Sequence, residues 1–513
     1  MVIEHSRAEA CFGPYRMAGN RRQNRFLACR RCAGALGPVD VAVSLPENLA
    51  LFSLPAECCD PKGAIAASLS VRRVAPDRIT VPLLGAVFRA PIGGADFSLH
   101  LAGETGSQKS ELAALAQQHF GAGMNARHLP ESWSSTANAL EAIASAAKDV
   151  VLTVDDFVPQ GTAVDRARLN AMADRVLRAQ NNRSGRARMR ANGTIIRPRP
   201  PRGLVLSTGE EVPAGASLRA RMLILELAPG QVDLERLTIS QHDASDGRLA
   251  EAMSLYIRWL APRLTEVRAS MNQIIDERRA IFSGHARTVT VLAQVYAAWT
   301  IWLRFAGEAG AVQESEAMAV AGEVWETLLC LAAEQHGNQQ QSDPVLRFVE
   351  LLASAISSGR AHVATVHAAG EPKNPEAWGW RKLSSGPVAQ GTCVGWLDDN
   401  GLYLDPDAAY AAAAMVAAGA GSGVGVAPST LHRRLLDRRL LLSTDSESGV
   451  NRSKRDARLA DGAVVCSTSR WIFWARLPKS VGHLGHLGRR VSDWRVRMAH
   501  VAHLAHDYVG RRA

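Results

Sequence analysis

The sequence predicts an α/β protein built on a mainly parallel sheet, with an all-α domain and a small C-terminal module after it. The first observation is that strand-like and helix-like patterns alternate between residues 95 and 230, as they do when crossover helices join parallel strands. The second is a glycine-containing loop at 103–110, placed between a strand-like run and a helix-like run. The third is a later strand-like run that ends in two adjacent aspartates. Together they predict a sheet with a phosphate-binding edge.

The strands of this sheet are predicted from short apolar runs bounded by turn-forming residues. A helix is predicted at 111–120, directly after the glycine-containing loop. The predicted strands are residues 96–101, 126–129, 149–154, 203–207 and 222–227.

Shifts in composition divide the rest of the chain. Apolar residues recur at helical spacing between 245 and 365, so this stretch is predicted to be wholly helical, with a linker at 338–344. The predicted parts are an irregular N-terminus at 1–40, an accessory segment at 41–94, the sheet core at 95–243, the helical domain at 244–370, a hairpin with a winged-helix-like module at 371–445, and a basic, disordered tail at 446–513.

The C-terminal module is predicted from a change to Gly-, Pro- and Trp-rich sequence after about residue 366. Two apolar runs, 393–397 and 402–404, flank an Asn-Gly pair, which is a strong hairpin signal. Helices are expected at 406–417 and 428–436.

The loop at 103–110 has the residue types that a phosphate site needs. Glycines let backbone N–H groups turn inward on phosphate oxygens, a lysine reaches the β- and γ-phosphates, and a hydroxyl binds Mg²⁺. Lys109 and Ser110 supply the last two, and the helix that follows directs its positive dipole end to the same place. We therefore expect ATP and Mg²⁺ as ligands. The expected nucleotide-binding residues are Gly103, Glu104, Thr105, Gly106, Ser107, Gln108, Lys109 and Ser110.

One residue of this loop departs from the usual pattern. The position before the lysine is normally glycine, and here it is Gln108. A Cβ at this point is expected to reshape the loop, with Gly106 supplying the flexibility instead. The expectation of ATP hydrolysis depends on this position.

Further positions complete the predicted catalytic set around Lys109. Asp155, at the end of its strand, is expected to hold Mg²⁺ with Ser110, and Asp156 is expected to orient the attacking water. Thr208 ends the next buried strand and is expected to sense the γ-phosphate. Arg219 precedes the last core strand and is expected to reach the nucleotide of a neighbouring subunit, with a surface ion pair as the alternative.

The order of these motifs resembles that of AAA+ and superfamily-3 helicases, which implies a P-loop NTPase core of the AAA+/RecA-like type. More closely, the chain resembles the DUF927 family of helicase/primase-type ATPases from phages and mobile elements, well from 42 to 230 and more loosely to 445. This resemblance implies a ring-forming, DNA-dependent ATPase of mobile-element replication, without a primase motif here. The segments behind it are HLAGETG at 100–106, KSELAALAQ at 109–117, WSSTANALE at 133–141, VDDF at 154–157, LSTGEEVP at 206–213 and SLR at 217–219.

An arginine-rich insert between the acidic strand and the strand that ends at Thr208 is the first candidate for DNA contact. The stretch 175–202 contains nine arginines and no acid, so it suits phosphate contact, and it lacks aromatics for base stacking. The alternative is a solvated basic loop. The residues expected to contact DNA are Arg178, Arg183, Arg186, Arg188 and Arg190.

The second candidate is the basic helix that begins at Pro428. Ser429 is suited to cap it, and its leucines are expected to face inward while His432, Arg433 and Arg439 face outward. This arrangement resembles a helix-turn-helix or winged-helix module. The alternative is an amphipathic helix that only packs on its neighbours.

The bulk composition agrees with a reduced, cytoplasmic protein that binds a polyanion. The net charge is +10 and the pI about 9.5. Eight irregularly placed cysteines form no disulfide framework, and no secretory signal or convincing membrane span is expected. A zinc site at Cys29, Cys32, Cys58 and Cys59 is a weak alternative, because the second pair is adjacent.

These observations predict an ATP-dependent DNA helicase or translocase that acts as a homo-oligomeric ring. The first alternative is a non-hydrolysing nucleotide- and DNA-binding regulator, which Gln108 and the missing glutamate beside Asp155 favour. The second is a signalling ATPase of the same fold that acts on protein partners and has no salt-dependent affinity for DNA.

Overall fold

The computed structural model describes the two units into which the chain divides, Met1–Gln339 and Gln340–Ala513. The division falls inside the stretch 244–370 that was predicted as a single helical domain. The described residues are 2–3, 25–28, 31–34, 37–39, 45–185, 187–189, 192–196, 198–281, 286–341, 343–366, 370–397, 402–419, 423–438, 440 and 471–473.

The first unit is built on a five-stranded sheet in which every pair of neighbouring strands is parallel. The strand order is β11-β5-β10-β7-β6, so β10 lies between the strand before the glycine-containing loop and the strand that ends in the aspartates. This confirms the predicted parallel α/β core. The strands are β5 Ser98–Ala102, β6 Glu131–Ser132, β7 Val151–Phe157, β10 Leu204–Gly209 and β11 Met222–Glu226.

The prediction of a strand at 126–129 is wrong. That segment is a turn, in which the Asn125 side-chain oxygen accepts a hydrogen bond from the Arg127 backbone amide at 3.0 Å and lies 2.9 Å from the His128 ring nitrogen Nδ1. An asparagine that bonds the backbone locally competes with strand pairing. The edge strand instead begins at Glu131, which pairs with Val154.

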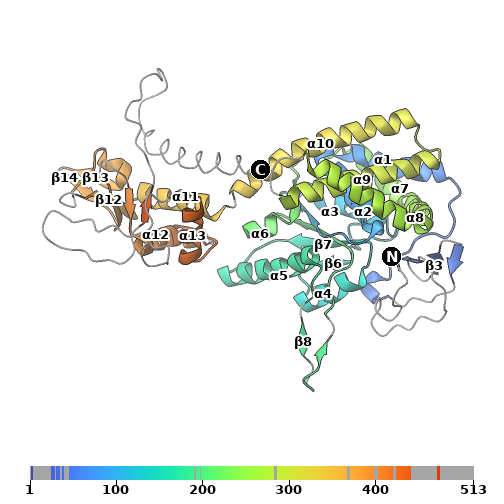
Figure 1. The fold of residues 1–513 in the computed structure, drawn as a ribbon, viewed down its shortest axis with the longest axis horizontal. Helices are drawn as coiled ribbons and strands as arrows, with labels where there is room; N and C mark the ends of the chain where they lie inside the picture. The colour runs from blue at the N-terminus through green and yellow to red at the C-terminus, as the bar shows by residue number, and fades with distance from the viewer. Residues whose placement is uncertain are drawn as a thin grey trace. The chain divides into compact units, whose positions relative to one another are not determined.

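Helices cover both faces of the sheet (Figure 1). α3 packs on β7 and β10, while α5 packs on β5 and β10 and contacts α4. α3 begins at Lys109, directly after the loop, and α5 begins with a capping box between Thr162 and Asp165. These helices are α1 Pro61–Ser70, α2 Asp77–Arg89, α3 Lys109–Gln118, α4 Ala137–Ala146, α5 Ala163–Asn182 and the short α6 Ala216–Arg219.

The helices that follow the sheet pack on the same core as the sheet. Phe88 of α2 stacks on Trp302 at 3.9 Å between ring centroids, and Tyr256 and Trp299 are also fully buried there. The two tryptophans are therefore core residues. These helices are α7 Leu234–Ser245, α8 Arg248–Arg279, α9 Ala286–Glu308 and α10 Glu314–Gln341.

Among the described residues, α9 is the one helix long and apolar enough to pass a test for a membrane span. Its most apolar 18-residue window is 83% buried inside the protein. A core helix of a soluble protein passes the same test, so this result is weak support for a span.

Short strands also form near the N-terminus, where the sequence predicted an irregular segment. They pair antiparallel in the order β1-β2-β3-β4, and β2 and β3 contact α8. The prediction is wrong here because cross-strand pairing leaves little periodic signal in strands this short. Their bounds are β1 Val2–Ile3, β2 Arg25–Ala28, β3 Arg31–Gly34 and β4 Gly37–Val39.

The described part of the second unit combines a mixed sheet with the helices α11, α12 and α13. In the order β12-β15-β16-β17 the first pair is parallel and the others are antiparallel. The antiparallel pairing of Leu397 with Leu402 confirms the predicted hairpin strands, and both predicted helices are present. The elements are α11 Pro344–Ser357, β12 Ala361–Thr365, β13 Trp380–Leu383, β14 Gly386–Ala389, β15 Thr392–Leu397, β16 Leu402–Leu404, α12 Pro406–Gly419, α13 Pro428–Asp437 and β17 Trp471–Phe473.

Two boundaries in this region differ from the predicted ones. The predicted linker at 338–344 is mostly helical, since α10 continues to Gln341 and α11 begins at Pro344. The stretch 245–365 is not wholly helical, because β12 occupies its end and pairs with β15. The tail 446–513 lies outside the described residues except for β17.

Candidate nucleotide site

The loop between β5 and α3 is held against the ends of two neighbouring strands. The Gly103 amide donates to the Gly209 carbonyl at 3.1 Å. A Cβ on Gly103 would lie 2.2 Å from the Leu227 carbonyl oxygen, so only glycine fits this close approach. The loop therefore starts from a fixed point at the carboxyl edge of the sheet, where ligands of open α/β sheets bind.

Gln108 adopts the conformation for which glycine is usually needed. Its backbone has φ 66° and ψ 25°, in the left-handed region. Its carbonyl accepts the Leu112 amide at 3.1 Å, so Gln108 caps the N-terminus of α3 with its backbone. Gly106 is also left-handed, at φ 85°. Gln108 itself adopts the strained left-handed conformation, so Gly106 does not have to take over the role of the missing glycine.

The Lys109 ammonium lies over the loop. Its Nζ donates to the Glu104 carbonyl at 2.8 Å and lies 3.4 Å from the Ser107 hydroxyl. Partial burial lowers the pKa of Lys109, while nearby carboxylates, Glu210 first among them, oppose that decrease. The lysine is thus held by acceptors of its own loop at the edge of the cavity.

Ser110, Asp155 and Thr208 meet on the other side of the loop. The Ser110 hydroxyl lies 3.0 and 3.3 Å from the two carboxylate oxygens of Asp155, and the Thr208 hydroxyl donates to the same carboxylate. The three side chains come from α3, β7 and β10, and the parallel pairing of β10 with β7 brings the last two together. The structure therefore places side by side three residues that the sequence assigned to one site.

An irregularity in the strand pairing sets the direction of the two aspartates. β10 and β7 stay in register from Leu204 to Ser207, but Gly209 then pairs with Phe157, so Thr208 stands opposite two residues. Such bulges re-aim side chains beside active sites. Asp156 takes φ 69° at this point, and its amide donates to the Thr208 hydroxyl at 3.1 Å.

A cavity of about 250 Å³ opens between these groups. Glu210 and Glu111 line it as well. Both lie in segments that carry the family resemblance, but the sequence assigned neither of them a role in the site. The only local signal for Glu210 is its place two residues after Thr208. The lining residues are Thr105, Gly106, Gln108, Lys109, Ser110, Glu111, Asp155, Asp156, Thr208, Gly209 and Glu210.

A buried polar network supports the strand ends from below. Ser207 Oγ lies 2.9 Å from His100 Nδ1 and accepts the Trp133 indole N–H at 2.9 Å, and His100 Nε2 lies 2.9 Å from the Glu211 carbonyl. His100 is fully buried, and burial lowers its pKa to about 4. The ring is therefore neutral at pH 7, and it ties β5 to β10 and to the segment after Glu210.

Arg219 does not line this cavity. Its side chain donates to the Pro213 carbonyl at 3.4 Å, beside the short helix α6. Arg221, two residues later, lines a separate cavity with Arg287. A role for Arg219 in another subunit's site stays a prediction.

The arginine-rich insert forms a hairpin between α5 and β10. β8 Arg188–Met189 pairs antiparallel with β9 Ile195–Ile196, and the hairpin projects from the first unit (Figure 1). Its base is tight: a Cβ on Gly185 would lie 2.6 Å from the Arg199 amide nitrogen. Met189 and Ile195 pair across the two strands and are exposed at 72% each, so the face that they form is not packed against the described part of the chain.

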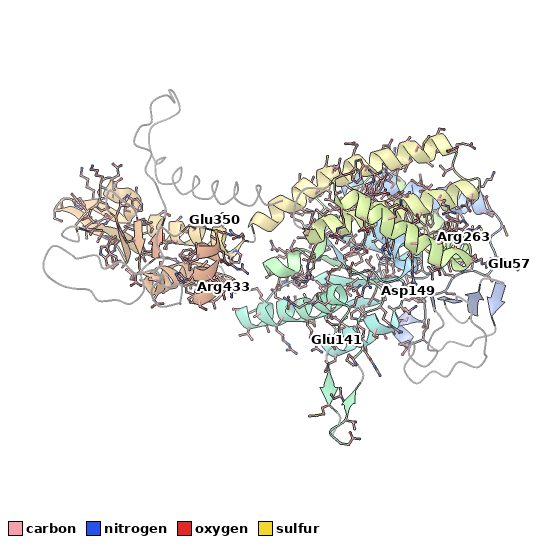
Figure 2. The ribbon with its side chains drawn as sticks, in the orientation of Figure 1. Glu57, Glu141, Asp149, Arg263, Glu350 and Arg433 are labelled. Carbon is pink, nitrogen blue, oxygen red and sulfur yellow. The ribbon has the colours of Figure 1, made fainter. Side chains whose placement is uncertain are left out.

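The arginines of this insert differ in their surroundings. Arg178 forms an ion pair with Asp174 on the same helix, and Arg175 pairs with Glu141, which is labelled in Figure 2. Arg183 ends α5 in a left-handed conformation and is exposed. The side chains of Arg186, Arg188 and Arg190 lie outside the described residues.

The basic helix α13 lies in the second unit. Arg433 is exposed there (Figure 2), as predicted. His432 is half-buried, and burial lowers its pKa, so the prediction that it faces outward is wrong in part. Leu431 and Leu435 pack in the core of this unit. Arg439 lies outside the described residues.

The weak zinc possibility finds no support in the described part of the chain. No group of three or more histidine, cysteine or carboxylate side chains there is arranged to hold a metal ion. Cys58 and Cys59 are free thiols, and the Cys29 and Cys32 side chains lie outside the described residues.

Comparison with known proteins agrees with the fold and with the predicted resemblance. The DUF927 family, described as a domain of unknown function, matches residues 78–192, which include the loop, both aspartates and much of the hairpin. The chain is also similar to the solved structure "SCCmec type IV Cch - active helicase", with a TM-score of 0.51 and 13% sequence identity over 87% of this chain and 78% of that chain. At this identity the likeness shows the fold alone. No curated protein matches the chain.

Proposed function

We propose that the protein is an ATP-dependent DNA helicase or translocase of a mobile element. The observation behind this proposal is the meeting of Ser110, Asp155 and Thr208 beside Lys109 in a cavity at the carboxyl edge of a parallel sheet. The strand order, with β10 between β5 and β7, supports a P-loop core of the AAA+ or superfamily-3 type. The fold of an active helicase and the DUF927 match support the same reading.

The residues present fit Mg²⁺ and a triphosphate. Mg²⁺ prefers hard oxygen ligands, and the Ser110 hydroxyl and Asp155 carboxylate already lie within 3.0 Å of each other. Bound Mg²⁺ would neutralise charge on the β- and γ-phosphates. Lys109 would exchange its loop acceptors for phosphate oxygens, and Thr208 would orient Asp155 and contact the γ-phosphate.

Gln108 bears on the choice between this function and a non-hydrolysing regulator. Its left-handed backbone makes the turn from the loop into α3, which begins at the next residue. The loop geometry that glycine normally provides is therefore retained at a cost in strain of about 1–2 kcal/mol. This favours an active site over a degenerate one.

The β8–β9 hairpin is the proposed DNA contact. It projects from the sheet core, it is exposed, and its stretch of the chain is rich in arginine and free of acid. Such a surface binds phosphate without reading bases, so affinity should fall steeply with salt. A ring of copies would direct several hairpins to one DNA strand, and Arg219 would then reach the nucleotide of the next copy.

An ATPase assay with and without single-stranded DNA tests this function. Wild type should hydrolyse ATP and be stimulated by DNA, Lys109→Ala should be inactive, and Lys62→Ala, an exposed lysine elsewhere, should resemble wild type. Replacing residues 186–197 by a glycine-serine segment of equal length should remove DNA stimulation and keep basal turnover. DNA binding with no turnover by wild type would refute the helicase proposal and favour the regulator; absence of DNA affinity would favour the signalling ATPase.

A further inference from the structure

The carboxylate of Glu210 occupies a position in the nucleotide site that the predicted roles leave unexplained. Glu210 follows β10 directly, and its amide donates to the Phe157 carbonyl at 3.3 Å. Its side chain extends to the tip of the glycine-containing loop, where it accepts a hydrogen bond from the Thr105 hydroxyl. Its backbone is thus held next to Phe157, beside the aspartates, while its side chain lines the cavity and reaches the loop tip.

Three of the four carboxylates that line the cavity act on the charge of Lys109, and these three are not equivalent. Asp155 accepts hydrogen bonds from Ser110 and Thr208, the arrangement expected of a metal-binding carboxylate. Asp156 sits in the bulge at φ 69°, and its side chain is one methylene shorter than a glutamate. Glu210 lines the same cavity, accepts a hydrogen bond from the loop tip, and raises the pKa of Lys109 more than either aspartate does.

This geometry points to Glu210, rather than Asp156, as the catalytic base that orients the attacking water. We infer further that Thr105 holds Glu210 in a resting position until a nucleotide fills the loop. The inference rests on the proposed ATPase function and adds to it a catalytic residue and a means of regulation. It also accounts for the missing glutamate beside Asp155: the glutamate comes from the neighbouring strand.

The water oxygen, hydrogen-bonded to Glu210, attacks the γ-phosphorus as the bond from that phosphorus to the β,γ-bridging oxygen breaks. ADP leaves with the bridging oxygen, and the proton of the water passes to the Glu210 carboxylate and then to solvent. The products are ADP, inorganic phosphate and a proton, with no change of oxidation state.

The test compares full-length single variants for ATP affinity and for turnover with single-stranded DNA. Glu210→Gln keeps the shape and removes the base, so kcat should fall about 10²- to 10⁴-fold while the Kd for ATP stays within about threefold. Glu211→Gln is the matched control, because only the backbone carbonyl of Glu211 takes part in the His100 contact, and it should turn over like wild type. Asp156→Asn should lose less than about tenfold in kcat.

Thr105 gives a second, independent readout. Thr105→Val removes the hydroxyl that binds Glu210 and leaves the base in place, so turnover without DNA should rise about two- to tenfold, the range of one net hydrogen bond. Thr105→Ser keeps the hydroxyl, so the increase in turnover should be smaller than in Thr105→Val.

Each outcome bears on the inference in a distinct way. A large loss of kcat in Glu210→Gln with ATP affinity intact, together with faster basal turnover in Thr105→Val, supports it. Loss of activity in Asp156→Asn but not in Glu210→Gln overturns it and leaves the ATPase function standing. Loss of ATP affinity in Glu210→Gln also overturns it, because the residue would then serve binding. No turnover by wild type overturns both the inference and the proposed function.

Discussion

Replacing Gln108 by glycine should stabilise the first unit and leave the nucleotide loop intact. Gln108 has φ 66° and ψ 25°, and this left-handed conformation raises the free energy of the folded state by about 1–2 kcal/mol for a residue with a Cβ. Glycine has no such strain in the folded state, but its greater freedom in the unfolded chain lowers the free energy of unfolding by about 0.4–1 kcal/mol. The net expectation for Gln108→Gly is a gain of about 0.5–1 kcal/mol in the free energy of unfolding.

Two companion substitutions separate backbone strain from loss of the side chain. Gln108→Ala keeps a Cβ, so it keeps the strain and should match wild type within about 0.5 kcal/mol. Gln108→Val places a β-branched residue in the left-handed region and should be less stable than wild type. The expected order of stability is therefore glycine, then glutamine and alanine together, then valine.

Hydrogen exchange in increasing urea, read by mass spectrometry on peptides from β5 and α3, is the suitable assay. The chain has two units, so a single global transition is not a safe measure of either one. ATP affinity of each variant is measured in parallel and should follow the same order. Equal stability of the glycine and alanine variants, or a glycine variant less stable than wild type, would refute the strain argument.

Buried and closely packed groups should also determine the pH dependence of stability, the binding of ATP and the stability of the second unit. Burial lowers the pKa values of His100 and His119 to about 4. As the pH drops from about 6.5 to about 4, the unfolded chain therefore binds protons before the folded protein does, and the free energy of unfolding should fall by up to about 3 kcal/mol for each histidine. Urea titrations that show no change of this free energy with pH across the window would contradict the prediction. Gly103→Ala should destabilise the first unit and abolish ATP binding, because the new Cβ would lie 2.2 Å from a backbone oxygen; a variant that binds ATP normally would count against it. Asp343 caps α11 and pairs with Arg438, so Asp343→Ala should destabilise the second unit by about 1–3 kcal/mol and Asp343→Asn by less, as measured by exchange in α11.

The sequence predicted the sheet well where its signals are local. Strands β5, β7, β10 and β11 lie within one to three residues of their predicted bounds, because each is a continuous buried apolar run next to a turn. The two-residue β6 and the N-terminal strands were missed or misplaced, because strands of this length have no periodicity to detect. β12 was missed because its pairing with β15 is not local.

The candidate site shows the same limit. That Lys109, Ser110 and Asp155 lie close together was predictable, because each belongs to a contiguous motif at the end of a predicted strand or start of a predicted helix. The position of Glu210 was not predictable, because it reaches Thr105 only through the pairing of β10 with β5, across 105 positions of the chain. The sequence singled out Gln108 as a departure from the usual pattern, but its left-handed backbone could be learned only from the structure.

The closed base of the β8–β9 hairpin has a consequence for how such proteins diversify. Gly185 and Arg199 meet at the point where the insert leaves and rejoins the core. The stability of the sheet should therefore depend little on the length and composition of the residues between them. Exchange of residues 186–197 as one segment would then change the surface that the hairpin presents and leave the loop at 103–110 in place. Under the proposed function, such an exchange would alter the contact with DNA and leave the nucleotide site unchanged.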